Sequence, residues 1–450
     1  DKIRFRKGRP EKIGGWEKYS SNTFQGTCRK IHVYKDIEQS QYKILGTHKK
    51  LYALQGDVYN DITPIRSTTS AGDVTFAATN GSSTITATDT SHGAVAGDFV
   101  TFSDAATLGG NITAAVLNQE YEIVSIPTAN TFTFVAKDTS GTEVTANSSD
   151  SGNGGSSTVG TYQINVGLDV YVSSTGWGVD TWGAGTFGSA TALSLTNQLR
   201  LWTIDNFGDD TIAAPRGGPI YYWDESSGLG TRAVLASSRS GASNTPVAVS
   251  QLLMSDVDRH VIALGSNPIG SSTIDPLLVR FSDAENAVDW TPTATNSAGG
   301  VRLSTGSLIV GGLQTRQEIL IWTDVGVVSM RFVGQPFIFS FNEIATGMSL
   351  ISPNGAATAG GVVYFMDDGA FYQYAGSVQK LPCTVLDYIF SDFNKGQAYK
   401  VFAAPNPKYN EIIWFYPSAS STEIDRYVTY NYLENSWSIG TTNDGFVRTA

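Results

Sequence analysis

Strand-like segments rich in aromatic and β-branched residues recur along this chain every roughly 43 to 63 residues, and this period constrains the fold most. The clearest unit, residues 410–440, reads NEIIWFYPSASSTEIDRYVTYNYLENSWSIG. It contains an apolar strand, a polar turn, an alternating strand, a second turn and a short strand. Because such a unit is most of a four-stranded meander, the repeat predicts a β-propeller.

Five other segments follow the same design with little sequence identity: residues 42–64, 197–226, 259–290, 318–341 and 361–382. Together the units predict an all-β fold, a propeller of about six blades. Side chains are apolar at consecutive positions in residues 319–322, 362–366 and 412–416. We therefore expect these three runs to be inner strands that are covered on both faces.

The first two units are separated by roughly 155 residues, about 100 more than the period allows. The excess begins and ends in polar, low-complexity sequence and contains strand-like runs such as DFVTFS and TFTFVA. We predict an inserted small β-barrel domain at residues 67–165, with the propeller formed by residues 1–66 and 166–450. Loop-closure entropy permits such an insertion, because its cost grows only with the logarithm of loop length.

Two local patterns concern the edges of the blades. Residues 381–396 place Val385, Ile389 and Phe393 on one face, which predicts a helix that caps a blade junction. Residues 3–19 read as two short strands around a KGRP turn. We expect them to be the outer half of a blade whose inner half comes from the other end of the chain, because this would remove an exposed sheet edge.

The chain is acidic, with 30 Lys and Arg residues against 41 Asp and Glu residues and a formal net charge of −11. This balance argues against binding nucleic acid through phosphate neutralisation, which needs clustered basic residues. We expect the basic residues near the N-terminus to face solvent or an acidic neighbouring protein: Lys2, Arg4, Arg6, Lys7, Arg9, Lys12 and Lys18. The sequence has no run of 18 apolar residues that would predict a membrane-spanning segment.

Cys28 and Cys383 are far apart in sequence and form no CxxC motif. Buried free thiols in a reducing compartment are the expectation for them, in preference to a disulfide. The chain begins on Asp1 within a strand-like run and stops at Ala450 without a clear terminator. We therefore expect residues to be missing at both ends.

Familiar catalytic and metal-binding motifs are incomplete. The four histidines show no metal-ligand spacing and are expected on the surface or in loops: His32, His48, His92 and His260. GAGTFG at residues 183–188 matches GxGxxG, but no strand precedes it and no helix follows, so a dinucleotide site is not expected. Phosphate-binding GxxxxGK[ST] and GxSxG motifs are absent from the sequence, and no cofactor is predicted.

Paired carboxylates are candidate catalytic groups, because some propellers are glycosidases that use paired acids. The obvious pairs are Asp209 with Asp210 and Asp367 with Asp368. Both pairs lie in turn sequences, where Asp side chains commonly accept hydrogen bonds from nearby backbone groups. We expect turn stabilisation from them and predict no catalytic residue.

Two other acidic stretches are candidate sites. Residues 282–290, SDAENAVDW, faintly echo the Asp-box turn of sialidase propellers, but Asn286 replaces the turn glycine and the box does not repeat. Asp205, Asp209 and Asp210 in DNFGDD offer oxygen ligands for Ca²⁺ without the twelve-residue loop pattern. We predict no metal site.

Four stretches together resemble the tail nozzle proteins of short-tailed bacteriophages, also called phage stabilisation proteins. They are RFRKGRPEKIGGWEKY (4–19), KKLYALQGDVYNDITP (49–64), FSDAENAVDWTP (281–292) and the unit at 410–440. The likeness covers the chain apart from the insert, and its motifs are blade strands and turns. Within the insert, SHGAVAGDFVTFSDAATLGGN and LNQEYEIVSIPTANTFTF resemble a small β-barrel module that recurs in phage structural proteins.

The resemblance implies a structural virion protein and not an enzyme. It implies a six-copy ring at the distal end of the tail, assembled in the bacterial cytoplasm and bound to the tail adaptor and to tail fibre or needle proteins. Double-stranded DNA would leave through the ring without being bound specifically.

Two other classes of function remain open, because propellers serve many functions. A phage tail adhesin or receptor-binding propeller would use the insert as its binding face. A glycosidase or depolymerase would need two or three acids on one rim, and mutation of Asp209 or Asp367 would then abolish sugar cleavage.

Overall fold

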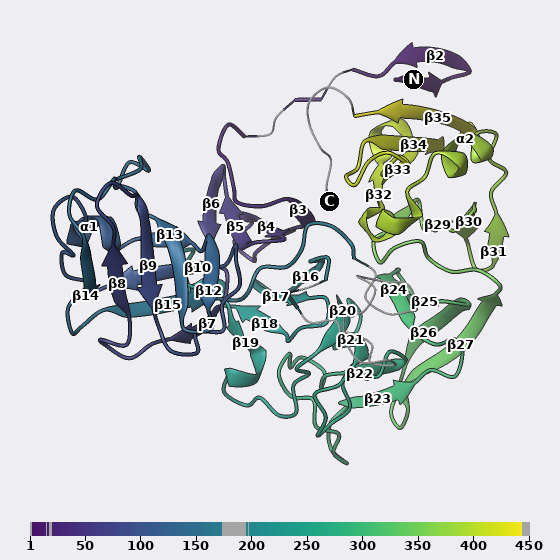
Figure 1. The fold of residues 1–450 in the computed structure, drawn as a ribbon. Helices are drawn as coiled ribbons and strands as arrows, with labels where there is room; N and C mark the ends of the chain where they lie inside the picture. The colour runs from purple at the N-terminus through teal and green to yellow at the C-terminus, as the bar shows by residue number, and fades with distance from the viewer. Residues whose placement is uncertain (1, 15, 18–19, 173–194, 197, 443–450) are drawn as a thin grey trace, which may run out of the picture.

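The computed structural model describes residues 2–14, 16–17, 20–172, 195–196 and 198–442. Six four-stranded antiparallel sheets follow one another around a common centre (Figure 1). Within each sheet, spatial neighbours are also neighbours in sequence. The chain is therefore a β-propeller of six blades, as the sequence period predicts.

The first three blades come from the N-terminal half of the propeller. Blade 1 contains β3 (Cys28–Lys35), β4 (Gln41–Thr47), β5 (Leu51–Gln55) and β6 (Val58–Asp61). Blade 2 contains β16 (Trp202–Phe207), β17 (Asp210–Pro215), β18 (Tyr221–Trp223) and β19 (Val234–Leu235). Blade 3 contains β20 (Val249–Met254), β21 (Val261–Ser266), β22 (Leu278–Phe281) and β23 (Gly299–Arg302).

The remaining three blades complete the ring. Blade 4 contains β24 (Ile309–Gln314), β25 (Ile319–Thr323), β26 (Gly326–Gly334) and β27 (Ile338–Thr346). Blade 5 contains β28 (Ala356–Ala359), β29 (Val362–Asp367), β30 (Ala370–Tyr374) and β31 (Val378–Lys380). Blade 6 contains β32 (Phe402–Asn406), β33 (Glu411–Tyr416), β34 (Arg426–Asn431) and β35 (Ser436–Thr441).

The apolar runs at 319–322, 362–366 and 412–416 lie in β25, β29 and β33, the second strands of their blades. Each is flanked by a strand on both sides and is almost wholly buried, which confirms the expectation of covered strands. The expectation that these runs are the inner strands is wrong, because the strands next to the centre are the first of each blade: β3 contacts β16, and β20 contacts β24. Sequence patterning therefore identifies the middle of a blade better than its inner edge.

The predicted helix at residues 381–396 is present in a shorter form. It comprises α2 (Leu386–Ser391), followed by the 3-10 helix η3 (Lys395–Lys400), between β31 and β32. Ile389 and Phe393 are buried in the apolar core shared by blades 5 and 6, and Val385 packs against it. Other short 3-10 turns occur in connections: η1 (Glu225–Ser227), η2 (Ala236–Ser238) and η4 (Pro407–Tyr409).

The segment between blades 1 and 2 forms two further sheets. One contains β7 (Ile65–Thr68), β10 (Phe99–Ser103), β11 (Glu120–Glu122) and β15 (Val159–Gln163). The other contains β8 (Thr75–Ala78), β9 (Thr84–Thr88), β12 (Ser125–Thr128), β13 (Thr131–Val135) and β14 (Asp150–Asn153). A short helix, α1 (Ala114–Leu117), follows β10.

Both sheets of the insert enclose one apolar core, as in a small β-barrel, with Phe76, Phe102 and Phe132 fully buried. Figure 1 shows the insert beside blades 1 and 2, outside the ring. The backbone N–H of Ile164 donates a hydrogen bond to the carbonyl oxygen of Pro64 at 3.0 Å. The chain thus leaves and re-enters the propeller at adjacent points.

Consecutive blades from 1 to 6 share continuous apolar cores across their five junctions. Between blades 1 and 2, the rings of Tyr42 and Trp223 are 5.9 Å apart. Between blades 5 and 6, Phe371 and Trp414 are 4.9 Å apart. Aromatic pairs at these distances stabilise the packing by more than the burial of their apolar area alone provides.

The junction between blades 6 and 1, which we call the seam, is built differently. Its apolar residues fall into two clusters, one on each blade. The N-terminal segment contributes Ile13 to the cluster on blade 6 and Phe24 to the cluster on blade 1. The ring of Trp16 lies 6.4 Å from Phe415 and 6.5 Å from Tyr427 on blade 6. The segment before β3 therefore packs against both sides of the seam.

Charged groups close the inner part of the seam. Arg29 of β3 donates hydrogen bonds of 2.7 and 3.1 Å to the carboxylate of Glu423, and Lys400 pairs with the same carboxylate. Burial alone would raise the pKa of Glu423, but the hydrogen bonds and charges of Arg29 and Lys400 outweigh it and lower the pKa below its usual range. Burial and the nearby Arg29 lower the pKa of Lys400.

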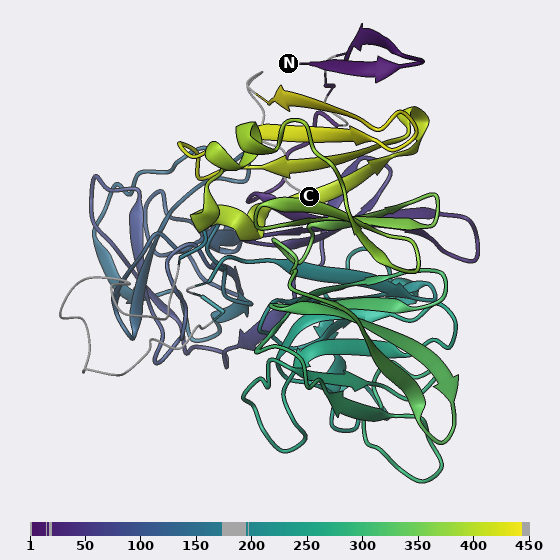
Figure 2. The ribbon, with the colours of Figure 1, turned by 90° about the vertical axis from the view of Figure 1, so that its right-hand side faces the viewer.

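The N-terminal hairpin departs from expectation. β1 (Ile3–Arg6) and β2 (Arg9–Lys12) form a two-stranded sheet of their own beside β35 (Figures 1 and 2). Blades 1 and 6 each have four strands from one continuous segment, so the prediction of a blade shared between the two ends is wrong. The hairpin is instead attached by side chains: both carboxylate oxygens of Glu411 accept 3.0 Å hydrogen bonds from Arg4.

Candidate functional site

The histidines are more enclosed than expected. His92 and His260 lie in loops but are buried, whereas His32 lies within β3 and His48 in a bend. Burial lowers the pKa of His48 to about 4. No cluster of three or more potential metal ligands occurs among the described residues.

Blade 3 contains a serine–histidine–aspartate constellation that the sequence did not predict. His260 Nδ1 lies 2.5 Å from Asp258 Oδ2, and its Nε2 lies 2.9 Å from Ser297 Oγ, in the order of a serine nucleophile, base and orienting acid. Ser297 Oγ, however, donates to Asp283 at 2.7 Å and accepts the N–H of Ala284 at 2.9 Å. The hydroxyl proton is directed at a carboxylate, so this cluster stabilises a loop.

His260 has no access to a substrate, because it is fully buried against Phe281 and Phe339. The cluster brings together positions 258, 260, 283 and 297, which follow no recognisable spacing. Sequence reasoning had no signal by which to find it.

The first acidic pair stabilises backbone in and around a turn of blade 2. Asp209 Oδ1 accepts the N–H of Ile37 at 2.9 Å. Asp210 accepts the Tyr222 hydroxyl at 2.5 Å and the N–H of Glu225 at 2.9 Å. Both carboxylates are thus used to join chain segments.

The second acidic pair lies at the turn after β29 in blade 5. The N–H of Asp368 donates to Asp367 Oδ1 at 2.8 Å, and Lys395 forms an ion pair with Asp368 at 2.8 Å. Burial raises the pKa of Asp367. The two acidic pairs belong to different blades, and the structure does not bring them together on one site.

The calcium-like and Asp-box-like stretches have structural roles, and Asp205 of the first lies within β16. Asp205 accepts the N–H groups of Asn206 and Met254 at 3.0 and 2.9 Å, which links blades 2 and 3. In the loop at 282–290, Asn286 Oδ1 accepts backbone N–H groups at 3.0 and 3.1 Å. The GxGxxG match at 183–188 lies outside the described residues.

The expectation for the N-terminal basic residues is partly wrong. Arg4 is buried in its ion pair with Glu411, and its guanidinium lies 3.5 Å from the centre of the Tyr409 ring. Exposed basic residues of this segment are Arg6, Lys7, Arg9 and Lys12. Lys18 lies outside the described residues.

Both cysteines are free thiols, as predicted, with Cys28 buried and Cys383 half-buried. Burial raises the pKa of Cys383 to about 11, which keeps it in the weakly reactive thiol form.

A charge network fixes the insert to the propeller. Lys50 of blade 1 is buried and forms ion pairs with Asp61 of the same blade, at 2.8 Å, and with Glu120 of the insert. Arg232, from blade 2, pairs with Asp61 at 2.5 Å, and Gln163 donates to Glu120 at 2.6 Å. Three chain segments therefore share one network of two cations and two carboxylates.

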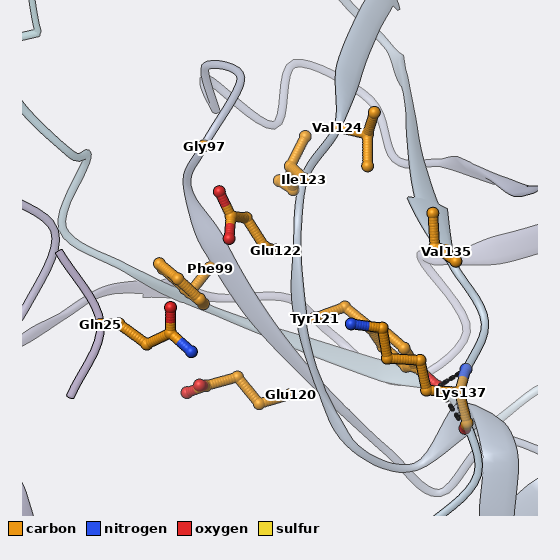
Figure 3. Close-up of a pocket in the computed structure, with 10 residues that line it drawn as sticks. All are labelled: Gln25, Gly97, Phe99, Glu120, Tyr121, Glu122, Ile123, Val124, Val135 and Lys137. Carbon is orange, nitrogen blue, oxygen red and sulfur yellow. Dashed lines mark hydrogen bonds between the residues drawn. The ribbon is translucent and has the colours of Figure 1, made fainter. Parts of the chain in front are cut away.

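A cavity of about 460 Å³ lies beside this network, on the insert. Glu120 and Glu122 point from one face of β11 toward Phe99 and Gln25 (Figure 3). They share this face because residues two positions apart on a strand point to the same side. Val124 is 56% exposed. The cavity thus combines apolar walls with two carboxylates that are already paired within the chain, Glu120 with Lys50 and Glu122 with Lys49 at 2.6 Å. Lys137 is the basic residue of its lining.

The hairpin of β26 and β27 is the other distinctive surface. Its strands have nine residues each, whereas the outer strands of the other blades have two to six. Phe337 at its tip is 77% exposed and Val333 is 53% exposed. Large apolar side chains gathered at an exposed tip mark an interaction surface.

Comparisons with known proteins identify no family. No family model matches the chain, and no curated protein matches it. Among solved structures, phage phi92 endosialidase matches at 12% identity over 91% of this chain and 55% of its own, with a TM-score of 0.24. Hsv2 of Kluyveromyces lactis matches at 10% identity over 52% of this chain and 60% of its own, with a TM-score of 0.30.

The CNH domain of AfRom2 matches at 9% identity over 55% of this chain and 71% of its own, with a TM-score of 0.33. At such TM-scores these likenesses carry no argument about function, and the assignment of the fold rests on the strand order of the chain itself. The fold defines a six-bladed β-propeller with an inserted two-sheet β domain. None of the helices among the described residues is long and apolar enough to cross a membrane.

Proposed function

We propose that this chain is a structural protein of the tail of a short-tailed bacteriophage. In this proposal it forms the distal nozzle, a ring of six copies that closes the tail and lets DNA leave during infection. The proposal rests on the sequence resemblance to nozzle proteins and on where the residues of that resemblance lie in the fold.

One observation carries the proposal: resembling stretches from opposite ends of the chain meet on blade 6. Arg4 of the first stretch pairs with Glu411 of the last at 3.0 Å. Trp16 of the first packs on Phe415 and Tyr427 of the last. The residues that carry the likeness thus fix the N-terminal segment to blade 6, beside the seam, which favours a structural role for them.

The candidate catalytic acids support the same function. Asp209, Asp210 and Asp367 accept hydrogen bonds from backbone N–H groups. Removing such acceptors would disturb local turns, because Asp side chains that accept backbone hydrogen bonds stabilise turn geometry. Their positions favour a scaffold over a hydrolase that cleaves surface sugars.

Labelling of virions of the phage that encodes the chain tests the proposal. Gold-coupled antibodies against the exposed tip residues Val333 and Phe337, or against an affinity tag, should mark the distal end of the tail by electron microscopy. Particles assembled without the protein should lose their packaged DNA. Label on lateral fibres would favour the adhesin instead, and its absence from virions would contradict the proposal.

A further inference from the structure

Lys30 differs from the buried lysines in its partner. The buried Lys50 and Lys400 form ion pairs with carboxylates. Lys30, half-buried in β3 of blade 1, instead donates a 3.3 Å hydrogen bond to Oδ1 of Asn354. Among the described residues, no carboxylate lies within ion-pair distance of Lys30. The amine of Lys30 is therefore held against a side-chain amide.

The contact joins two parts of the propeller that are 324 positions apart in the sequence. Asn354 precedes β28 of blade 5, and its carbonyl oxygen accepts the N–H of Ala403, in β32 of blade 6, at 2.8 Å. Lys30 follows Arg29, whose ion pair with Glu423 closes the inner part of the seam. Lys30 and Asn354 thus meet across the seam, where the apolar residues form two separate clusters.

The surroundings of Lys30 favour the neutral form of its amine. Burial lowers the pKa of Lys30, and the charge of Asp205, on β16 of the neighbouring blade, offsets only part of this effect. Burial also raises the pKa of Asp205. An unprotonated lysine nitrogen is a nucleophile, and a protonated carboxyl group can deliver a proton to a departing group. The pKa values of Lys30 and Asp205 are thus shifted toward the forms that amide exchange requires.

We propose that Lys30 and Asn354 form an isopeptide bond, a covalent cross-link between blade 1 and the junction of blades 5 and 6. Nζ of Lys30 attacks Cγ of Asn354, so that a new C–N bond forms and the bond from Cγ to Nδ2 breaks. One N–H proton of the lysine passes to the departing nitrogen, which leaves as ammonia, and no other reactant is consumed. Asp205 is the carboxyl group whose charge acts on Lys30, and it can carry this proton.

The departing nitrogen is free to leave. Nδ2 of Asn354 donates no hydrogen bond to any residue that the structure describes, so the part of the chain in view does not retain it. At the seam the cross-link supplements the ion pair of Arg29 and Glu423. A cross-link between distant positions also restricts the unfolded chain and so stabilises the fold. The bond forms in a chain of any function, so its test is independent of the proposed function.

Mass spectrometry of the intact, purified chain tests the cross-link. The unaltered chain should be lighter than its sequence by one ammonia, and Lys30→Arg and Asn354→Ala should each restore the full mass. Lys35→Arg is the matched control, because Lys35 is an exposed lysine of the same strand, and it should keep the deficit. After digestion, tandem mass spectrometry should identify a branched peptide that joins Lys30 to Asn354.

One competing reaction also releases ammonia. Asn354 precedes Gly355, and attack by the backbone nitrogen of Gly355 would give a cyclic succinimide. The N–H of Gly355 is engaged, since it donates to the carbonyl oxygen of Ser352 at 2.9 Å. A mass deficit that persists in Lys30→Arg, with a linear peptide, would identify the succinimide and overturn the proposal. The full sequence mass in an unaltered chain that is folded by circular dichroism would overturn it as well.

Discussion

Replacing Glu423 by Gln tests whether charged groups hold the seam of the propeller closed. The side chains of Arg29 and Lys400 are 3% and 0% exposed, and both pair with Glu423. Removing one partner from a buried ion pair costs about 3–5 kcal/mol. Because the Glu423 side chain is 27% exposed, water compensates part of the loss, and we expect about 2–3 kcal/mol.

Hydrogen exchange of the amides in β3 and β32 measures this opening directly. At about 1.4 kcal/mol per factor of ten, exchange at pH 7 should accelerate by about 30- to 150-fold. The matched control is Glu285→Gln, since Glu285 and its partner Arg259 are 64% and 42% exposed. This control should change exchange by less than about threefold.

The stabilisation by Glu423 depends on pH with a definite sign. The folded-state pKa of Glu423 is lowered, so its stabilisation is complete above the unfolded pKa of about 4.3 and is lost as pH falls through the folded value. The amide exchange rates of the original chain and of Glu423→Gln should therefore differ fully at pH 7 and converge in acid. Equal exchange rates for Glu423→Gln and the surface control at pH 7 would refute the argument.

Three further predictions concern the insert, DNA and catalysis. Replacing residues 65–163 by a short glycine linker should leave cooperative thermal unfolding of the propeller intact, because Pro64 and Ile164 are hydrogen-bonded at 3.0 Å; loss of the transition in calorimetry would place the insert in the core. The protein should show little affinity for duplex DNA in ~150 mM salt by filter binding, and tight binding that is lost in Arg6→Glu/Arg9→Glu would contradict this expectation. Incubation with bacterial surface polysaccharides should release no reducing ends, and turnover abolished by Asp209→Asn or Asp367→Asn would favour the enzyme.

The period of the sequence predicted the blades because buried second strands leave a clear pattern. In β33, EIIWFY, all six residues are buried between two neighbouring strands, so apolar side chains follow one another without a break. First strands near the centre mix polar and apolar residues, as CRKIHVYK in β3 does. Their position in the blade was therefore not predictable from apolar runs.

The sequence did not predict contacts between residues that are far apart in the chain. The sequence around Arg4 has the pattern of an exposed basic segment, but the fold places Arg4 against Glu411. Ser297 and His260 likewise meet only because β21 and the loop before β23 are neighbours in blade 3. Turn acids such as Asp209 were predictable, since their hydrogen bonds reflect local backbone geometry.

Native mass spectrometry of the purified chain tests the central claim most directly. We expect a closed assembly of six copies, about 290 kDa from a chain of 48.1 kDa. A protein that remains at the mass of a single chain at micromolar concentration would contradict the claim.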